Sequence, residues 1–138
     1  MTAAEARRLF ITARVARLAT ADAECRPHLV PIVFAVDGDT VYSAVDSKPK
    51  RTTALRRLAN VEANPAVALL ADHYDDGDWD ALWWVRADGS GRVLDPGADE
   101  ARRAVEMLGR RYPQHHADPP LGPVLAVAVE RWSGWSAR

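Results

Sequence analysis

Apolar side chains recur at every second position in several stretches of the chain, and this spacing predicts β-strands. The clearest alternation runs over residues 15–20, whereas residues 66–70 and 124–129 are almost wholly apolar. The run at 124–129 is typical of a strand buried on both faces. Six strands are predicted in all, at residues 15–20, 28–36, 40–45, 66–70, 82–94 (with a turn or bulge at 87–91) and 124–129.

Local turn signals indicate how some of these strands are connected. The sequence Asp37-Gly38-Asp39 favours a tight hairpin, so residues 40–45 should return antiparallel to residues 28–36. Pro31 lies inside the earlier of these strands and cannot donate a backbone hydrogen bond. We therefore expect that strand at an edge of the sheet or at a bulge.

Three helices are predicted between the strands. A capping box of Thr2 and Glu5 opens the first, which we expect to end near Ala13. The second covers about residues 50–62, where apolar side chains recur at helical spacing, and it stops at Asn64-Pro65. The third covers roughly residues 98–111 and is closed by a proline.

Strands joined mostly by hairpins, with one helical crossover, indicate a small closed antiparallel barrel with peripheral helices. The expected fold class is mainly β (α+β). The chain has 138 residues, of which 48% are hydrophobic, so it can bury a core of its own. We expect residues 1–138 to form one domain, and the apolar content makes a disordered chain improbable.

Charge and cysteine content exclude several functional classes. The 18 Lys and Arg residues nearly balance the 19 Asp and Glu residues, which argues against a nucleic acid as the main partner. Cys25 is the single cysteine, so an internal disulfide cannot form. The sequence shows no signal peptide and no run of about 20 apolar residues for a membrane helix. We expect a cytoplasmic protein that binds neither nucleic acid nor membrane.

The chain has only two lysines, and both lie in the segment Ser47-Lys48-Pro49-Lys50-Arg51-Thr52-Thr53. This segment follows a predicted strand and begins a predicted helix, where free amide groups and the helix dipole favour an anion. Lysine charge, an arginine fork and hydroxyl groups add further donors. A phosphate site is favoured over an ordinary solvated loop.

Three of the five tryptophans lie close together, at Trp79, Trp83 and Trp84. Trp83 and Trp84 are neighbours on a strand, so they point to opposite faces and cannot share one role. Core or subunit packing is the simpler explanation for at least one of them. Trp79 lies at the end of a loop, where contact with a planar ligand and a purely structural role are equally reasonable.

The sequence contains no catalytic set of its own. His115 and His116 are better explained as surface residues than as metal ligands, and the acidic residues 72–80 lack the spacing of a calcium loop. Cys25 has no assigned histidine partner, and no nucleophile elbow or dinucleotide motif is present. A phosphate site without acid–base residues suits an enzyme whose cofactor carries the chemistry.

Five segments of the chain form a recognisable series: residues 15–20 (VARLAT), 26–31 (RPHLVP), 47–52 (SKPKRT), 64–65 (NP) and 78–86 (DWDALWWVR). In this order and spacing they resemble the pyridoxamine-phosphate-oxidase-like split β-barrel superfamily. The resemblance is closer to its deazaflavin branch, whose enzymes use coenzyme F-420, and it covers nearly the whole chain. At the turn before Arg26 this chain has Glu24-Cys25, where many relatives have a glycine.

The resemblance implies an FMN-binding type of split barrel with six strands and a homodimer with two cofactor sites at its interface. It also implies hydride transfer between a deazaflavin and a small organic substrate. The cofactor phosphate would meet Lys48, Lys50, Arg51 and Thr52, the strand from His28 to Pro31 would run beside the ring, and Trp79 would reach the cofactor region. Arg56 or Arg57 could bind a polyglutamate tail, which is a hypothesis from charge placement.

Two other interpretations stay open. FMN, whose single phosphate needs fewer cations, would make the protein an oxidase or reductase of the same fold. The third interpretation is a flavin- or haem-binding module without turnover, in which His73 is the plausible axial ligand. The sequence does not identify the substrate or the direction of hydride transfer.

Overall fold

The computed structural model describes residues 1–45 and 51–138, and only the backbone of residues 51–55. Its helices are α1 (Ala3–Thr12), α2 (Arg51–Ala63), α3 (Asp99–Arg111), α4 (Pro113–Ala117) and the short 3-10 helix η1 (Trp79–Ala81). Its strands are β1 (Ala16–Ala21), β2 (Pro27–Ile32), β3 (Ala35–Asp37), β4 (Thr40–Ala44), β5 (Ala66–His73), β6 (Trp83–Leu94) and β7 (Val124–Ser136).

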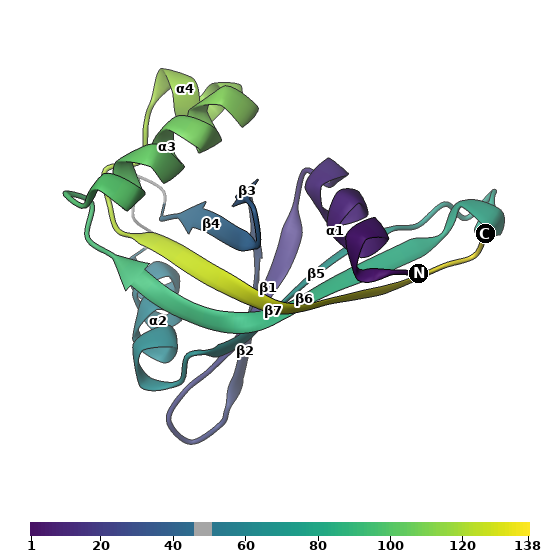
Figure 1. Cartoon of the computed structure of the whole chain (residues 1–138). Coiled ribbons are helices and arrows are strands. Elements are labelled where there is room, and N and C mark those ends of the chain that lie inside the picture. The colour runs from purple at the N-terminus through teal and green to yellow at the C-terminus, as the bar shows by residue number, and fades with distance from the viewer. Residues whose placement is uncertain (46–50) are drawn as a thin grey trace.

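The described strands form one antiparallel sheet of seven strands in the order β2-β1-β5-β6-β7-β4-β3. The sheet curls strongly, and its two edges are β2 and β3 (Figure 1). The mainly β class and the hairpin of β3 and β4 are confirmed, with Gly38 in the turn at φ 60°. The prediction of six strands is wrong, because residues 28–36 form two strands rather than one.

The break between β2 and β3 is set by a distant tyrosine. Phe34 is fully buried, and its N–H donates to the Tyr112 hydroxyl at 3.2 Å. The hydroxyl lies 3.0 Å from the Phe34 carbonyl as well as 3.0 Å from the Arg14 carbonyl. Because the tyrosine satisfies the backbone of Phe34, this residue needs no neighbouring strand. The chain therefore leaves β1 and pairs next with β4.

Two apolar clusters hold the fold together. The larger lies inside the barrel and joins α1 to the sheet through side chains such as Phe10, Leu18, Leu69 and Val85. The capping box predicted for α1 is present, with Thr2 N–H donating to Glu5 Oε2 at 2.6 Å. The smaller cluster packs α3 against β4 and β7.

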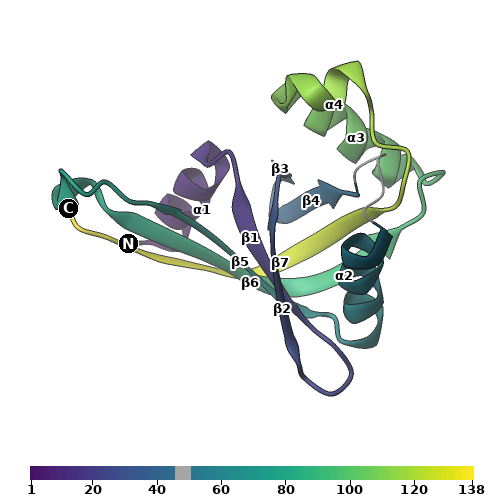
Figure 2. The ribbon, with the colours of Figure 1, turned by 180° about the vertical axis from the view of Figure 1, so that it is seen from behind.

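The hairpin of β5 and β6, together with the second half of β7, extends beyond the barrel as an arm (Figure 2). Both chain termini lie on the side of this arm, and Ala137 N–H donates to the Leu82 carbonyl at 2.9 Å. β7 runs to Ser136 rather than ending near Val129, because Trp132 continues the core and the strand stays paired with β6. Residues 113–117 form the short helix α4, with Pro113 in its first turn.

The 87–91 region is a bulge within one long strand. The register between β6 and β7 shifts at Asp88 and Gly89, so Glu130 has no opposite residue. A Cβ atom at Gly89 would lie 2.2 Å from the Ala128 carbonyl oxygen, which explains why a glycine stands there. None of the described helices combines the length and the apolar content that crossing a membrane requires.

Candidate functional site

The predicted phosphate segment is only partly described. Lys48 and Lys50 lie outside the described residues. Arg51 and Thr52 form the first turn of α2, and only their backbone is described. Helix α2 begins at Arg51, one residue after the predicted start, so the cation-rich segment stands at a helix start as the sequence indicated.

The far half of α2 is fixed to the barrel. Asn60 is buried, and its Nδ2 donates to the Thr20 hydroxyl of β1 at 3.1 Å. Val61 packs close to β6, where a Cβ atom at Gly91 would lie 2.9 Å from its Cγ1. Because the helix is held at this end, its first turn has a set position relative to the sheet. Sequence reasoning missed Thr20 and Asn60, since a buried polar pair has no periodic signal.

Arg57 and His28 lie at this anchored side of α2. Arg57 is half-buried whereas its neighbour Arg56 is exposed. Burial lowers the pKa of Arg57. Burial also lowers the pKa of His28, and the positive charges of Arg56 and Arg57 lower it further. Arg57 Nε and His28 Nδ1 are both buried and have no hydrogen-bond partner.

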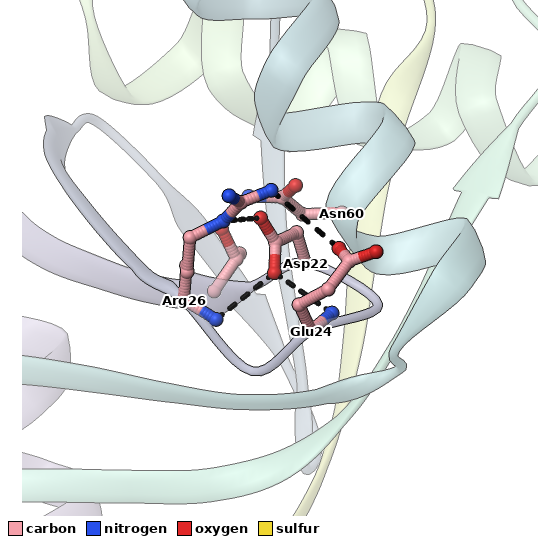
Figure 3. Close-up of polar contacts among 5 residues, drawn as sticks. Asp22, Glu24, Arg26 and Asn60 are labelled. Carbon is pink, nitrogen blue, oxygen red and sulfur yellow. Dashed lines mark hydrogen bonds and ion pairs between the residues drawn. The ribbon is translucent and has the colours of Figure 1, made fainter.

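The turn between β1 and β2 lies next to α2 (Figure 3). Asp22 Oδ1 accepts from the backbone N–H groups of Glu24 and Arg26, each at 2.9 Å, and Oδ2 accepts from Arg26 Nε at 2.7 Å. The hydrogen bonds from Arg26 lower the pKa of Asp22. Cys25 is exposed and adopts φ 62°, a conformation that suits glycine better than any L-residue. This explains physically why a glycine is the ordinary residue in such a turn.

β2 presents an edge to its surroundings. It pairs only with β1 in the described sheet, so the backbone groups on its other side are not used by a strand. Pro31 is exposed there and offers a carbonyl but no N–H. The edge position predicted from Pro31 is confirmed, and it leaves backbone hydrogen bonds available to a ligand. Whether His28 and Pro31 contact a cofactor stays a prediction.

Trp79 lies far from α2 within one chain. α2 ends just before β5 begins, whereas η1 and Trp79 follow the other end of β5, at the tip of the arm (Figure 1). The eight residues of β5 span about 24 Å. Trp79 is 65% exposed and forms no part of the core. In a single chain, Trp79 therefore cannot share one site with the described part of α2.

Trp83 and Trp84 lie on opposite faces of the sheet, as neighbours on one strand must. Trp83 packs against the core and stacks on His73 with ring centroids 6.3 Å apart. Trp84 faces the opposite side, where it lies beside Trp135 of β7, and the two are 38% and 48% exposed. Leu29 and Leu70 are also exposed on this outer face, which we call the open sheet face. Sequence reasoning missed Trp135, because the predicted final strand stopped too early.

Two cavities flank the arm on its inner side. One of about 620 Å³ lies between α1 and β7, with Arg8, Trp135 and Arg138 among its lining residues. The other, of about 380 Å³, lies beneath His73 and Trp83 and shares Arg138 with the first. Neither is lined by a residue predicted to bind the deazaflavin, whereas His73, the predicted axial ligand of the haem interpretation, lines the second.

The acidic loop at the arm tip is organised by its own hydrogen bonds. Asp75 and Asp78 accept from backbone N–H groups two residues ahead, and Tyr74 donates to Asp76 at 2.8 Å. Over residues 1–45 and 51–138, no three His, Cys, Asp or Glu side chains come together as metal ligands would. Hydrogen bonds within the loop therefore account for its acidic residues.

Residues 2–136 match the pyridoxamine 5′-phosphate oxidase family, and the chain belongs to this family. The split-barrel resemblance found in the sequence is thereby confirmed at family level. No curated protein matches the chain.

Solved structures share the same fold at low sequence identity. Conserved hypothetical protein Rv2991 from Mycobacterium tuberculosis is 22% identical with a TM-score of 0.73, over 100% of this chain and 86% of that one. An FAD-binding protein from Mesorhizobium loti is 21% identical with a TM-score of 0.73, over 97% and 94% of the two chains. HutZ, the haem storage protein of Vibrio cholerae, is 16% identical with a TM-score of 0.71, over 99% and 95%.

Proposed function

We propose that this chain is a deazaflavin-dependent oxidoreductase that transfers a hydride between coenzyme F-420 and a small organic substrate. The observation that carries this proposal is the position of α2. The cation-rich segment of residues 48–52 leads into a helix of 13 residues whose far half is fixed to β1 and β6. Amide groups at such a helix start, with the added cations, suit the phosphate of a cofactor.

The residues predicted from the sequence suit a cofactor of this kind. Lys48, Lys50, Arg51 and Thr52 would hold its phosphate, and the free edge of β2 would hydrogen-bond the ring beside His28 and Pro31. A bound deazaflavin supplies the hydride chemistry itself. The chain would contribute binding, orientation and the exclusion of water, which agrees with the lack of a catalytic set in its sequence.

A homodimer would complete the site. The open sheet face carries Leu29 (67% exposed), Leu70, Trp84 and Trp135, which favours burial against another surface. A two-fold axis passing near the middle of β5 and β6 exchanges the two ends of this hairpin. Such an axis would bring the arm tip of one chain, with Trp79, toward α2 of the other. This arrangement explains how residues so far apart in one chain could share a ligand.

The dimer is tested by replacing an open-face residue. Trp84→Glu should convert a dimer into a monomer in sedimentation velocity, because it places a charge in an apolar interface. Leu121→Glu, at an apolar residue that is 78% exposed and lies outside the open sheet face, is the matched control and should leave the mass unchanged. A wild-type chain that is monomeric at high concentration would contradict the arrangement.

Flavin is the first alternative, supported by the FAD-binding structures of the same fold. Deazaflavin is favoured because the α2 region has more cations than the single phosphate of FMN needs. Haem is the second alternative, supported by the fold of a haem storage protein and by His73 beside a cavity. His73 is exposed and stacks on Trp83, so it is accessible as an axial ligand.

The deciding experiment titrates purified, cofactor-free protein with coenzyme F-420 and with FMN, following tryptophan and cofactor fluorescence. We expect micromolar or tighter binding of F-420 and at least roughly tenfold weaker binding of FMN. Lys48→Ala or Lys50→Ala should weaken F-420 binding by about 10- to 100-fold through loss of a charge-assisted contact. Arg110→Ala, an exposed cation on α3, is the control and should have no effect.

Each other outcome selects an alternative. Tighter binding of FMN would make the protein a flavin enzyme. A Soret band on haem addition that disappears in His73→Ala would make it a haem-binding protein. Binding of none of the three would contradict a cofactor function for this chain.

A further inference from the structure

The anchored side of α2 contains two polar atoms that the fold leaves without partners. Arg57 Nε and His28 Nδ1 are both shielded from solvent, and neither has a hydrogen bond. Folded proteins rarely leave such atoms unpaired, because each costs about 1–3 kcal/mol. Two such atoms, one on α2 and one on β2, therefore need an explanation.

The two residues are brought together by the packing of α2 on β1 and β2. His28 lies directly opposite Thr20 in the register of β1 and β2. Thr20 in turn accepts a hydrogen bond from Asn60, which lies three residues after Arg57 and hence on the same side of α2. The charge of Arg57 is near enough to lower the pKa of His28. The packing of α2 on β1 and β2 therefore places Arg57 and His28 at the same helix–sheet contact.

The described residues offer no counter-charge to Arg57. Among them, no carboxylate forms an ion pair with this arginine, although its burial lowers its pKa. The acidic residues of the neighbouring turn are already engaged, since Asp22 and Glu24 both pair with Arg26, at 2.7 Å and 3.6 Å. A half-buried cation without a nearby anion lowers the stability of the folded state, and an anionic ligand would offset that loss.

We propose that Arg57 and His28 bind an anionic oxygen group, a carboxylate or a phosphate, of a ligand held at α2. This deepens the proposed function, because it requires a second anion apart from the phosphate at the helix start. Arg57 follows Arg51 by six residues, which is about 9 Å along a helix. Both anions can belong to one cofactor, such as a deazaflavin with a carboxylate tail, or the second can belong to the substrate.

The test uses inorganic phosphate as the probe and the imidazole NMR signals of His28 as the local readout. Phosphate replaces chloride at constant ionic strength, so that general screening does not change. In the wild type, phosphate should raise both the pKa of His28 and the melting temperature. In Arg57→Met the affinity read at His28 should fall at least about tenfold, as expected for loss of a charge-assisted contact. Arg57→Lys should retain part of the phosphate affinity of the wild type.

Arg56→Met is the matched control, because Arg56 is the exposed neighbour on the same helix. It should change the phosphate affinity at His28 by less than about twofold, the size of a screened surface charge. Without phosphate, Arg57→Met should melt about 3 °C higher than the wild type, because it replaces a half-buried charge that has no ion pair among the described residues with an apolar chain. If Arg57 only packed against its neighbours, Arg57→Met would melt at a lower temperature than the wild type.

Two results would overturn the proposal. One is an unchanged phosphate response of His28 in Arg57→Met, and the other is a lower melting temperature of that variant without phosphate. Neither measurement uses F-420 or FMN, so failure of the cofactor titration does not affect them. Comparing F-420 with a tail-less deazaflavin then identifies the source of the anion. If Arg57→Met weakens only the tailed form, the anion belongs to the cofactor, and if it weakens neither, the anion belongs to the substrate.

Discussion

Helices α2 and α3 both lie against the barrel and both carry arginines, yet they treat buried polar groups in opposite ways. At the end of α3, the Tyr112 hydroxyl accepts from Phe34 N–H and from Arg111 Nε, and its own proton reaches a carbonyl. Arg111 also donates to the Ala13 carbonyl, and its guanidinium lies 4.7 Å from the centroid of the Phe34 ring. Along α2, in contrast, Arg57 and His28 keep buried atoms without partners.

The difference separates a region that stabilises the fold from one that, in our proposal, a ligand completes. Polar groups at α3 gain their hydrogen bonds within the chain, so their removal should cost stability. At α2, Asn60 has its partner, but Arg57 keeps a buried atom without one, so removal of Arg57 should not cost stability. Substitutions in the two regions should therefore differ in sign. Arg57→Met at α2 should raise the melting temperature, whereas the substitutions at α3 should lower stability, and they follow in order of expected size.

Tyr112→Phe should cause the largest loss. The tyrosine is 8% exposed, and the substitution leaves Phe34 N–H buried without an acceptor. We expect the free energy of unfolding in urea to fall by about 2–3 kcal/mol. Tyr74→Phe is the control, because the Tyr74 hydroxyl contacts only the exposed Asp76 and its loss should cost less than about 0.5 kcal/mol. Equal losses in both variants would show that the buried hydrogen bonds of Tyr112 stabilise the fold no more than the exposed hydrogen bond of Tyr74 does.

Glu100→Gln should have a smaller effect that depends on pH. Glu100 at the start of α3 accepts from Arg92 at 2.6 and 2.8 Å and from Tyr42 at 2.7 Å. The bonds from Arg92, then from Tyr42, lower the pKa of Glu100 from 4.5 to about 2. Burial and the bond to Glu100 raise the pKa of Tyr42 to about 12.

Because the pKa of Glu100 is lowered in the folded state, its contribution is complete above pH 4.5 and disappears as the pH falls toward 2. Arg92 is half exposed, so we expect a loss of only about 1 kcal/mol in the glutamine variant at pH 7. The difference between wild type and variant should vanish near pH 2. A matched substitution, Glu106→Gln on the exposed side of α3, should show no such pH dependence.

The same contrast explains how far the sequence could predict the fold. The strand at 15–20 and helix α1 were predictable, because alternation and a capping box are local signals. The break at Phe34 was not, since it depends on Tyr112, which lies 78 residues away. The predicted strand of residues 28–36 was therefore too long, and the strand count one too low.

The candidate site divides in a similar way. The clustering of Lys48 and Lys50 before a helix was visible in the sequence, and so was the opposite orientation of Trp83 and Trp84. The environment of Arg57 was not, because burial without a counter-charge depends on three elements packing together. Polar residues without periodicity carry no signal of their burial.

The β1–β2 turn beside α2 provides the smallest test, and it asks whether strain there serves the ligand. Cys25 adopts φ 62°, which costs an L-residue about 1 kcal/mol, so Cys25→Gly should raise the unfolding free energy by about 0.5–1 kcal/mol. Ala23→Gly in the same turn, where φ is not positive, should lower it slightly by loosening the unfolded chain. If Cys25→Gly also leaves the phosphate response of His28 unchanged, the strain is independent of the site. If that response weakens, the turn holds β2 in its binding position, and the incomplete region of the molecule then extends from α2 to the turn.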